Sequence, residues 1–161
     1  MVYGSHGEDL IKLLASKLVP IITAIDRASS VIDRYNKVHQ SLLEIVKANG
    51  LATGNVTTTE IQDATPASLY AHISARKCYT PEKTAELCPS ETLQKGGLGS
   101  ITEQLLKNHA DITLGGGSAH FDTVATAGQY QGKTLLQQAK ARGFRIVNNL
   151  KELQAVDAVN Q

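Results

Sequence analysis

The sequence predicts an α/β fold, in which a short parallel sheet with flanking helices is preceded by an N-terminal helix or a helical hairpin. Residues 8–49 carry apolar side chains at the i, i+3, i+4 spacing of an amphipathic helix. After Gly50, short β-type runs alternate with helical patterns, and this alternation favours a parallel sheet covered by helices. We therefore distinguish a helical segment, residues 1–49, from an α/β segment, residues 50–161, and expect both to pack as one compact domain.

The helical segment has an apolar stripe along most of its length. Its members are Leu10, Leu13, Leu14, Leu18, Ile21, Ile22, Ile25, Val31, Ile32, Tyr35, Val38, Leu42, Leu43, Ile45 and Val46. Ser29 or Ser30 is a candidate cap for a second helix, and Asn49-Gly50 is a helix stop. One long kinked helix and a hairpin both fit this pattern. In either case we expect residues 8–46 to bury a set of side chains against the sheet or against a second chain: Leu14, Leu18, Ile22, Ile25, Ile32 and Leu43.

The α/β segment divides into shorter elements. Thr65 and Pro66 suit the cap and first turn of a helix, and Ser100 with Glu103 matches a capping box. Gly143 is a helix stop. We predict strands at 51–58, 111–114 and 144–147, helices at 66–76, 100–109, 133–142 and 149–159, and a loop at 77–99.

Composition excludes two classes of partner. The net charge is +1 and no long run of one sign occurs, so the sequence predicts no basic stripe for nucleic acid. No apolar stretch reaches the length of about 18 residues that a membrane span needs. The longest apolar run, residues 18–25, contains Pro20 and lacks a small-residue cleavage site after it, so it does not predict a signal peptide.

The cysteines and histidines give weaker signals. Cys78 and Cys88 lie ten positions apart in a loop-like stretch, and this spacing alone leaves open both a bridge and two separate thiols. The histidines have neither a His-x₃-His nor a His-Glu-x-x-His spacing, and they are His6, His39, His72, His109 and His120. They do not predict a zinc site. The glycines at 115–117 follow a predicted strand without a Lys-Ser or Lys-Thr, so a turn is favoured over a phosphate loop.

Several long segments of the sequence match one known protein family in order along the chain. The likeness begins near His39 and covers about three quarters of the chain. The matching segments, in order, are Leu42-Leu-Glu-Ile-Val-Lys-Ala-Asn-Gly, Leu51-Ala-Thr-Gly-Asn-Val-Thr-Thr-Thr-Glu-Ile-Gln-Asp-Ala-Thr-Pro-Ala, Ala71-His-Ile-Ser-Ala-Arg-Lys-Cys, Lys95-Gly-Gly-Leu-Gly-Ser-Ile-Thr-Glu-Gln-Leu-Leu, Ala110-Asp-Ile-Thr-Leu-Gly-Gly-Gly, Ala125-Thr-Ala-Gly-Gln-Tyr-Gln-Gly-Lys-Thr-Leu and Gln138-Ala-Lys-Ala-Arg-Gly. In these segments the chain resembles the alkaline phosphatases of enteric bacteria.

The resemblance implies roles for five residues. Asp63 and Thr65 match an acidic and a hydroxyl ligand of the family's magnesium ion, and both are hard oxygen donors of the kind that Mg²⁺ prefers. Arg76 matches the arginine that binds substrate phosphate, since its planar fork can hold two phosphate oxygens. Cys78 and Cys88 match a family disulfide, which implies an oxidising compartment, by resemblance the periplasm.

Other family features have no counterpart in the sequence. The resemblance implies a serine nucleophile in an Asp-Ser-Ala context, but the best stand-in, Asp26-Arg27-Ala28, has arginine at the serine's place. Most of the family's zinc ligands fall beyond the stretch that resembles residues 39–161. We therefore assign no catalytic residue and no zinc, and treat the chain as a truncated form.

Three functions from different classes follow. The first is a catalytically silent alkaline-phosphatase-like protein with weak Mg²⁺ or phosphate binding. The second is an interaction module in which the helical segment forms a homo-oligomer or binds a helical partner. The third, a phosphomonoester hydrolase with a rebuilt site, needs a nucleophile and charge stabilisation that the sequence does not show.

Overall fold

The structure is a computed structural model and describes residues 39–156. The predicted helix or hairpin over residues 8–38, with the expected burial of Leu14, Leu18, Ile22, Ile25 and Ile32, lies outside the described residues. The division of the chain at Gly50 stays a prediction.

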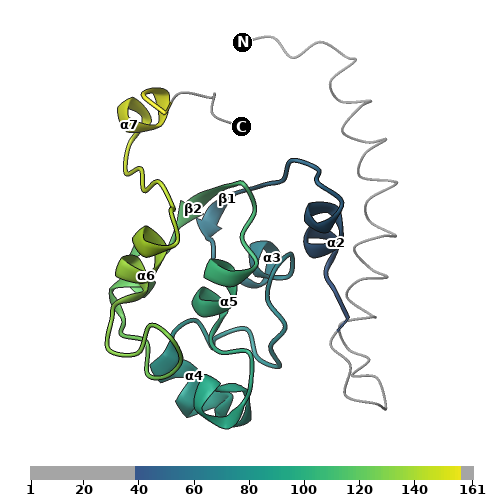
Figure 1. The fold of residues 1–161 in the computed structure, drawn as a ribbon, viewed down its shortest axis with the longest axis vertical. Coiled ribbons are helices and arrows are strands. Elements are labelled where there is room, and N and C mark those ends of the chain that lie inside the picture. Colours follow the sequence, from purple (N-terminus) through teal and green to yellow (C-terminus); the bar gives the residue numbers. More distant parts are fainter. Residues whose placement is uncertain (1–38, 157–161) are drawn as a thin grey trace.

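The described residues form a mixed α/β unit in which a two-stranded parallel sheet is flanked by helices (Figure 1). The predicted fold class is therefore confirmed. The elements in chain order are α2 (Leu42–Ala48), β1 (Gly54–Glu60), α3 (Ala64–Ala67), α4 (Pro81–Leu87), η1 (Pro89–Glu91), η2 (Leu93–Lys95), α5 (Ile101–Lys107), β2 (Ile112–Gly116), η3 (Ser118–Asp122), α6 (Leu135–Ala141) and α7 (Leu150–Gln154).

The two strands pair in parallel because the long connection through α3, α4 and α5 returns the chain to the start of the sheet. Gly54 pairs with Ile112 and Val56 with Leu114, and the register becomes irregular before the last pair, at Glu60. The Asn55 side chain is buried on one face of the sheet, where its Nδ2 donates to the Pro66 carbonyl at 3.1 Å. This face is covered by α3.

The core consists of two clusters of buried side chains on either side of α5. The first joins the end of β1, α3 and α5 through Ile61, Ala67, Tyr70, Ile101 and Leu105. The second joins α5 to α6 through Leu106, Ala125, Leu135 and Ala139. Most of these side chains are aliphatic.

Helix α2 ends as the sequence predicts, but residues 39–41 are not helical, so the helical run predicted through residue 46 is interrupted before Leu42. The Ser41 side chain and Glu44 form a capping box at its start, and Gly50, with φ of 74°, follows its end. Leu43 is 6% exposed, which confirms its expected burial. At the other end, Lys47 Nζ lies 2.6 Å from Asp111 Oδ1, which ties α2 to the start of β2.

The predicted helix 66–76 is wrong, because helical structure ends at Ala67. The helix is capped by Asp63, so Thr65 and Pro66 lie within it rather than at its start. After α3, the backbone of His72 bonds to the side chain of Gln104 in α5: its N donates to Oε1 at 2.8 Å and its carbonyl accepts from Nε2 at 3.2 Å. These bonds replace the ones that a continuing helix would make.

Two further predictions need correction. The expected loop 77–99 contains α4, whose N-cap Thr80 accepts a hydrogen bond from the Lys83 backbone, and two 3₁₀ turns. The expected strand 144–147 does not form. Phe144 instead packs its ring against the second core cluster and against His109, at 4.5 Å between ring centroids. Phe144 is half-buried by these contacts, whereas Ile146 in the same predicted strand is 39% exposed.

The remaining predicted elements are present with shifted ends, and of the predicted helix 149–159 the described residues contain α7, Leu150–Gln154. β1, β2, α5 and α6 fall within or next to the predicted ranges, and the Ser100–Glu103 capping box of α5 is confirmed. In the part of the chain that the structure describes, no helix is both long and apolar enough to cross a membrane.

Candidate phosphate and metal site

Asp63 lies just beyond the carboxyl end of β1, the end of a parallel strand where α/β proteins commonly bind ligands. It is the N-cap of α3, but its side chain makes no capping hydrogen bond. The carboxylate therefore remains available to other groups, and its Oδ1 accepts a hydrogen bond from the Tyr79 hydroxyl at 2.7 Å. Thr65, two residues further on, is exposed.

The structure brings Arg76 next to Asp63, as a shared site requires. One guanidinium nitrogen, Nη2, lies 3.8 Å from Asp63 Oδ1. The arginine side chain is 67% exposed and the aspartate 30% exposed. At this exposure and distance the pair contributes little to stability, so the guanidinium is free to bind an anion from solution.

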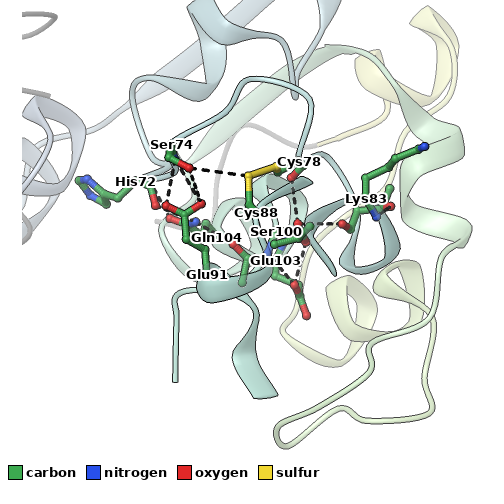
Figure 2. The surroundings of a disulfide bond; sticks show 12 residues. His72, Ser74, Cys78, Lys83, Cys88, Glu91, Ser100, Glu103 and Gln104 are labelled. Atoms are coloured by element: carbon green, nitrogen blue, oxygen red, sulfur yellow. Dashed lines mark hydrogen bonds between the residues drawn. A yellow bond between two sulfur atoms is a disulfide. The ribbon is translucent and has the colours of Figure 1, made fainter. Parts of the chain in front are cut away.

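The loop that carries Arg76 is fixed on both sides (Figure 2). Before it, the Ser74 backbone N donates to Glu91 Oε1 at 3.0 Å, and the Ser74 hydroxyl donates to Oε2 of the same carboxylate at 3.1 Å. After it, Cys78 is bonded to Cys88, which confirms the disulfide implied by the resemblance. Both cysteines are buried.

Sequence reasoning missed three residues of this site: Glu60, Tyr79 and His120. The Tyr79 ring lies 5.0 Å from the His120 ring between centroids, and His120 Nε2 lies 3.1 Å from Glu60 Oε2. Burial, followed by the hydrogen bond to Asp63, raises the pKa of the Tyr79 phenol, so the hydroxyl stays protonated and donates at neutral pH. No sequence motif joins these residues.

Two other histidines, His72 and His109, have partners outside the site. His72 Nε2 is 2.8 Å from Glu44 Oε2, which attaches the loop after α3 to α2. Burial lowers the pKa of His109, which packs on Phe144 and is kept neutral there. Among residues 39–156, no three His, Cys, Asp or Glu side chains gather in a way that could hold a metal ion.

A magnesium ion fits this site only as a largely hydrated ion. Within the described residues, the contacts of the Asp63 carboxylate fall on Oδ1. Oδ2 is thus left for a cation, and the exposed Thr65 hydroxyl is a second hard oxygen donor. Water would complete the octahedral shell, as is common for Mg²⁺.

These features place a guanidinium beside an oxygen-donor carboxylate, just beyond the carboxyl end of a parallel strand. The family model for alkaline phosphatase matches residues 22–161, so the chain belongs to the alkaline phosphatase family. The match begins at residue 22, upstream of His39, near which the resemblance described from the sequence begins. Members of this family bind metal ions.

Several curated proteins resemble the chain. It is 59% identical over 130 residues to alkaline phosphatase H of Pseudomonas aeruginosa and 56% identical over 130 residues to the alkaline phosphatase of Escherichia coli. Both alignments cover 81% of this chain, and 27% and 28% of those relatives. Streptomycin-6-phosphate phosphatase of Streptomyces griseus is 42% identical over 132 residues, covering 78% of this chain and 29% of the relative. The chain thus spans less than a third of the length of these relatives.

Proposed function

We propose that the 161-residue chain binds inorganic phosphate and a hydrated Mg²⁺ weakly and does not hydrolyse phosphomonoesters. The observation that carries this proposal is the Asp63–Arg76 pair, which places an oxygen donor and a guanidinium side by side. Both side chains face solvent, and water competes for both, so we expect dissociation constants on the order of millimolar.

We infer the absence of turnover from the lack of the family's nucleophile motif and of its zinc ligands. The sequence contains no Asp-Ser-Ala word. Ser74 and Ser100 donate their hydroxyls to the carboxylates of Glu91 and Glu103, respectively. Neither is paired with a histidine base in the described residues, and no site for two zinc ions is formed there.

We expect no turnover of p-nitrophenyl phosphate above buffer when Zn²⁺ and Mg²⁺ are added to the purified chain. The measurement is a continuous absorbance assay run beside a phosphate titration followed by NMR. Arg76→Ala should abolish the phosphate-induced shifts, whereas Lys77→Ala, which removes an exposed cation from the same loop, should leave them nearly unchanged. Metal-dependent turnover that survives repurification and is lost in Arg76→Ala would contradict the proposal.

A second proposal concerns the outer face of the sheet. Val56 and Ile112 are 70% and 56% exposed. By the strand register they lie on the face opposite to Asn55, which α3 covers. Parallel sheets are normally covered on both faces.

We propose that the apolar stripe of residues 10–25 in the same chain packs on this face. Residues 26–41 join the stripe to α2. When extended they reach about 50 Å, which is longer than the distance that they must span across a domain of this size. The tether also gives the stripe a high effective concentration at the face. This proposal keeps an interaction role for the helical segment. The segment would cover the sheet of its own chain rather than form a homo-oligomer.

A double-mutant cycle tests this packing. Leu18→Asp and Val56→Asp are each expected to lower the free energy of unfolding by about 1–3 kcal/mol, and the double variant by no more than the larger single effect. Leu150→Asp is a matched control, since Leu150 is 68% exposed on α7, which lies apart from the sheet (Figure 1). Additive losses would contradict a contact between the two positions. A sedimentation mass of two chains that falls to one in Val56→Asp would instead assign the cover to a second copy.

A further inference from the structure

The backbone of Tyr79, in the candidate site, is held by contacts with buried residues. Its carbonyl accepts two hydrogen bonds from Thr102, from the backbone N at 3.2 Å and from the hydroxyl at 2.7 Å. Thr102 is fully buried in α5, and the residue before Tyr79 is the disulfide-bonded Cys78. The backbone of Tyr79 is therefore fixed to the core of the protein.

The ring of Tyr79 is held as well. His120, from η3 after β2, packs against it at 5.0 Å between centroids and a tilt of 57°. His120 is in turn held by Glu60 at the carboxyl end of β1, with 3.1 Å between Nε2 and Oε2. Two segments that are 60 positions apart thus meet behind the tyrosine ring and restrict the direction of its hydroxyl.

The fixed hydroxyl acts on one oxygen of Asp63. It donates to Oδ1 at 2.7 Å, and the Arg76 guanidinium lies 3.8 Å from the same oxygen. A carboxylate held through one oxygen cannot rotate freely, so its other oxygen keeps a constant direction. Outer partners of this kind commonly orient metal-binding carboxylates.

We propose that Tyr79, supported by His120, is a positioning residue that holds the Asp63 carboxylate with Oδ2 directed to a divalent cation. This inference rests on the proposed binding function and names the residue that organises its metal half. Tyr79 touches neither the cation nor the phosphate. Its removal should therefore affect the two ligands differently.

The test uses the full chain and two separate probes, MgCl₂ alone and inorganic phosphate alone, each followed by amide chemical shifts in NMR titrations. Tyr79→Phe keeps the ring on His120 and removes only the donor. It is expected to weaken Mg²⁺ binding about tenfold, in the range found when outer partners of metal ligands are removed. Phosphate binding through Arg76 should change less than about twofold. The guanidinium is mostly exposed and its pair with Asp63, at 3.8 Å, is weak, so it depends little on the direction of the carboxylate.

Controls separate positioning from a general structural effect. Tyr130→Phe removes a hydroxyl from another half-buried tyrosine, whose ring packs on Arg142 at 5.0 Å, and should leave both titrations unchanged. His120→Phe should weaken Mg²⁺ binding less than Tyr79→Phe does. The positioning role is overturned if Tyr79→Phe lowers only the unfolding midpoint, or if it weakens the binding of Mg²⁺ and of phosphate equally. If the unmodified chain binds neither probe, the proposed function fails together with this inference. If the unmodified chain binds Mg²⁺ and Tyr79→Phe binds it equally tightly, only this inference is overturned.

Discussion

Replacing Gly97 with alanine is expected to destabilise the protein by at least about 3 kcal/mol. An added Cβ would lie 2.3 Å from the carbonyl carbon and oxygen of Glu91 and 2.5 Å from its Cα, all of them backbone atoms. A side chain can rotate away from such a clash, but this backbone cannot, because Glu91 O also accepts the Gly99 N–H at 2.9 Å. Overpacking usually costs about 1–3 kcal/mol, and a backbone clash belongs at or above the upper end.

The measurement is urea unfolding of the Gly97→Ala chain beside the Gly54→Ala chain. Gly54 is a matched control, since an added Cβ there meets nothing within 4 Å and its φ is not in the left-handed region. Since domains of this size have a total stability of only about 5–15 kcal/mol, Gly97→Ala should lose much of its cooperative transition. A change of less than about 0.5 kcal/mol would show that the turn relaxes without cost.

Replacing both Cys78 and Cys88 with alanine is expected to lower the free energy of unfolding by about 3 kcal/mol, the chain-entropy value for a loop this short. The bridge joins the loop that carries Arg76 to the C-cap of α4. Its loss should therefore also loosen the Arg76 loop and weaken phosphate binding. Thiol titration of the denatured, unreduced protein made under oxidising conditions should find no free thiol.

Reduction provides the internal control for this prediction. Dithiothreitol should lower the unfolding midpoint of the wild-type chain to near that of the double variant and should leave the double variant unchanged. Two free thiols in protein made under oxidising conditions, or equal stability of the two chains, would contradict the structural role of the bridge. Protein made in a reducing cytosol can show two free thiols without contradiction.

Helix ends are the part of the fold that sequence reasoning predicted best. The Ser100–Glu103 box, the stop at Asn49-Gly50 and the glycine after α6 at Gly143 all rest on contacts within a few residues. Such contacts form whatever the rest of the chain does, so their residues are readable locally. The two strands β1 and β2 were likewise predicted from short β-type runs between helical patterns.

The errors arose where distant contacts outweigh local pattern. The helix predicted at 66–76 stops early because His72 bonds to Gln104, 32 positions away. The apolar run at 144–147 is typical of a strand, yet Phe144 packs on the second core cluster instead. A run of four residues contains too little information to distinguish these outcomes.

The candidate site shows the same division. The sequence by itself determined that the chain has a carboxylate at Asp63, a guanidinium at Arg76 and two thiols ten positions apart, and the family resemblance suggested roles for them. Only the tertiary structure decided that these groups meet and that Tyr79, His120 and Glu60 join them. The physical reason is that these contacts link positions 16 and 60 residues apart, and packing of α5 and the parallel pairing of β1 with β2 bring those positions together.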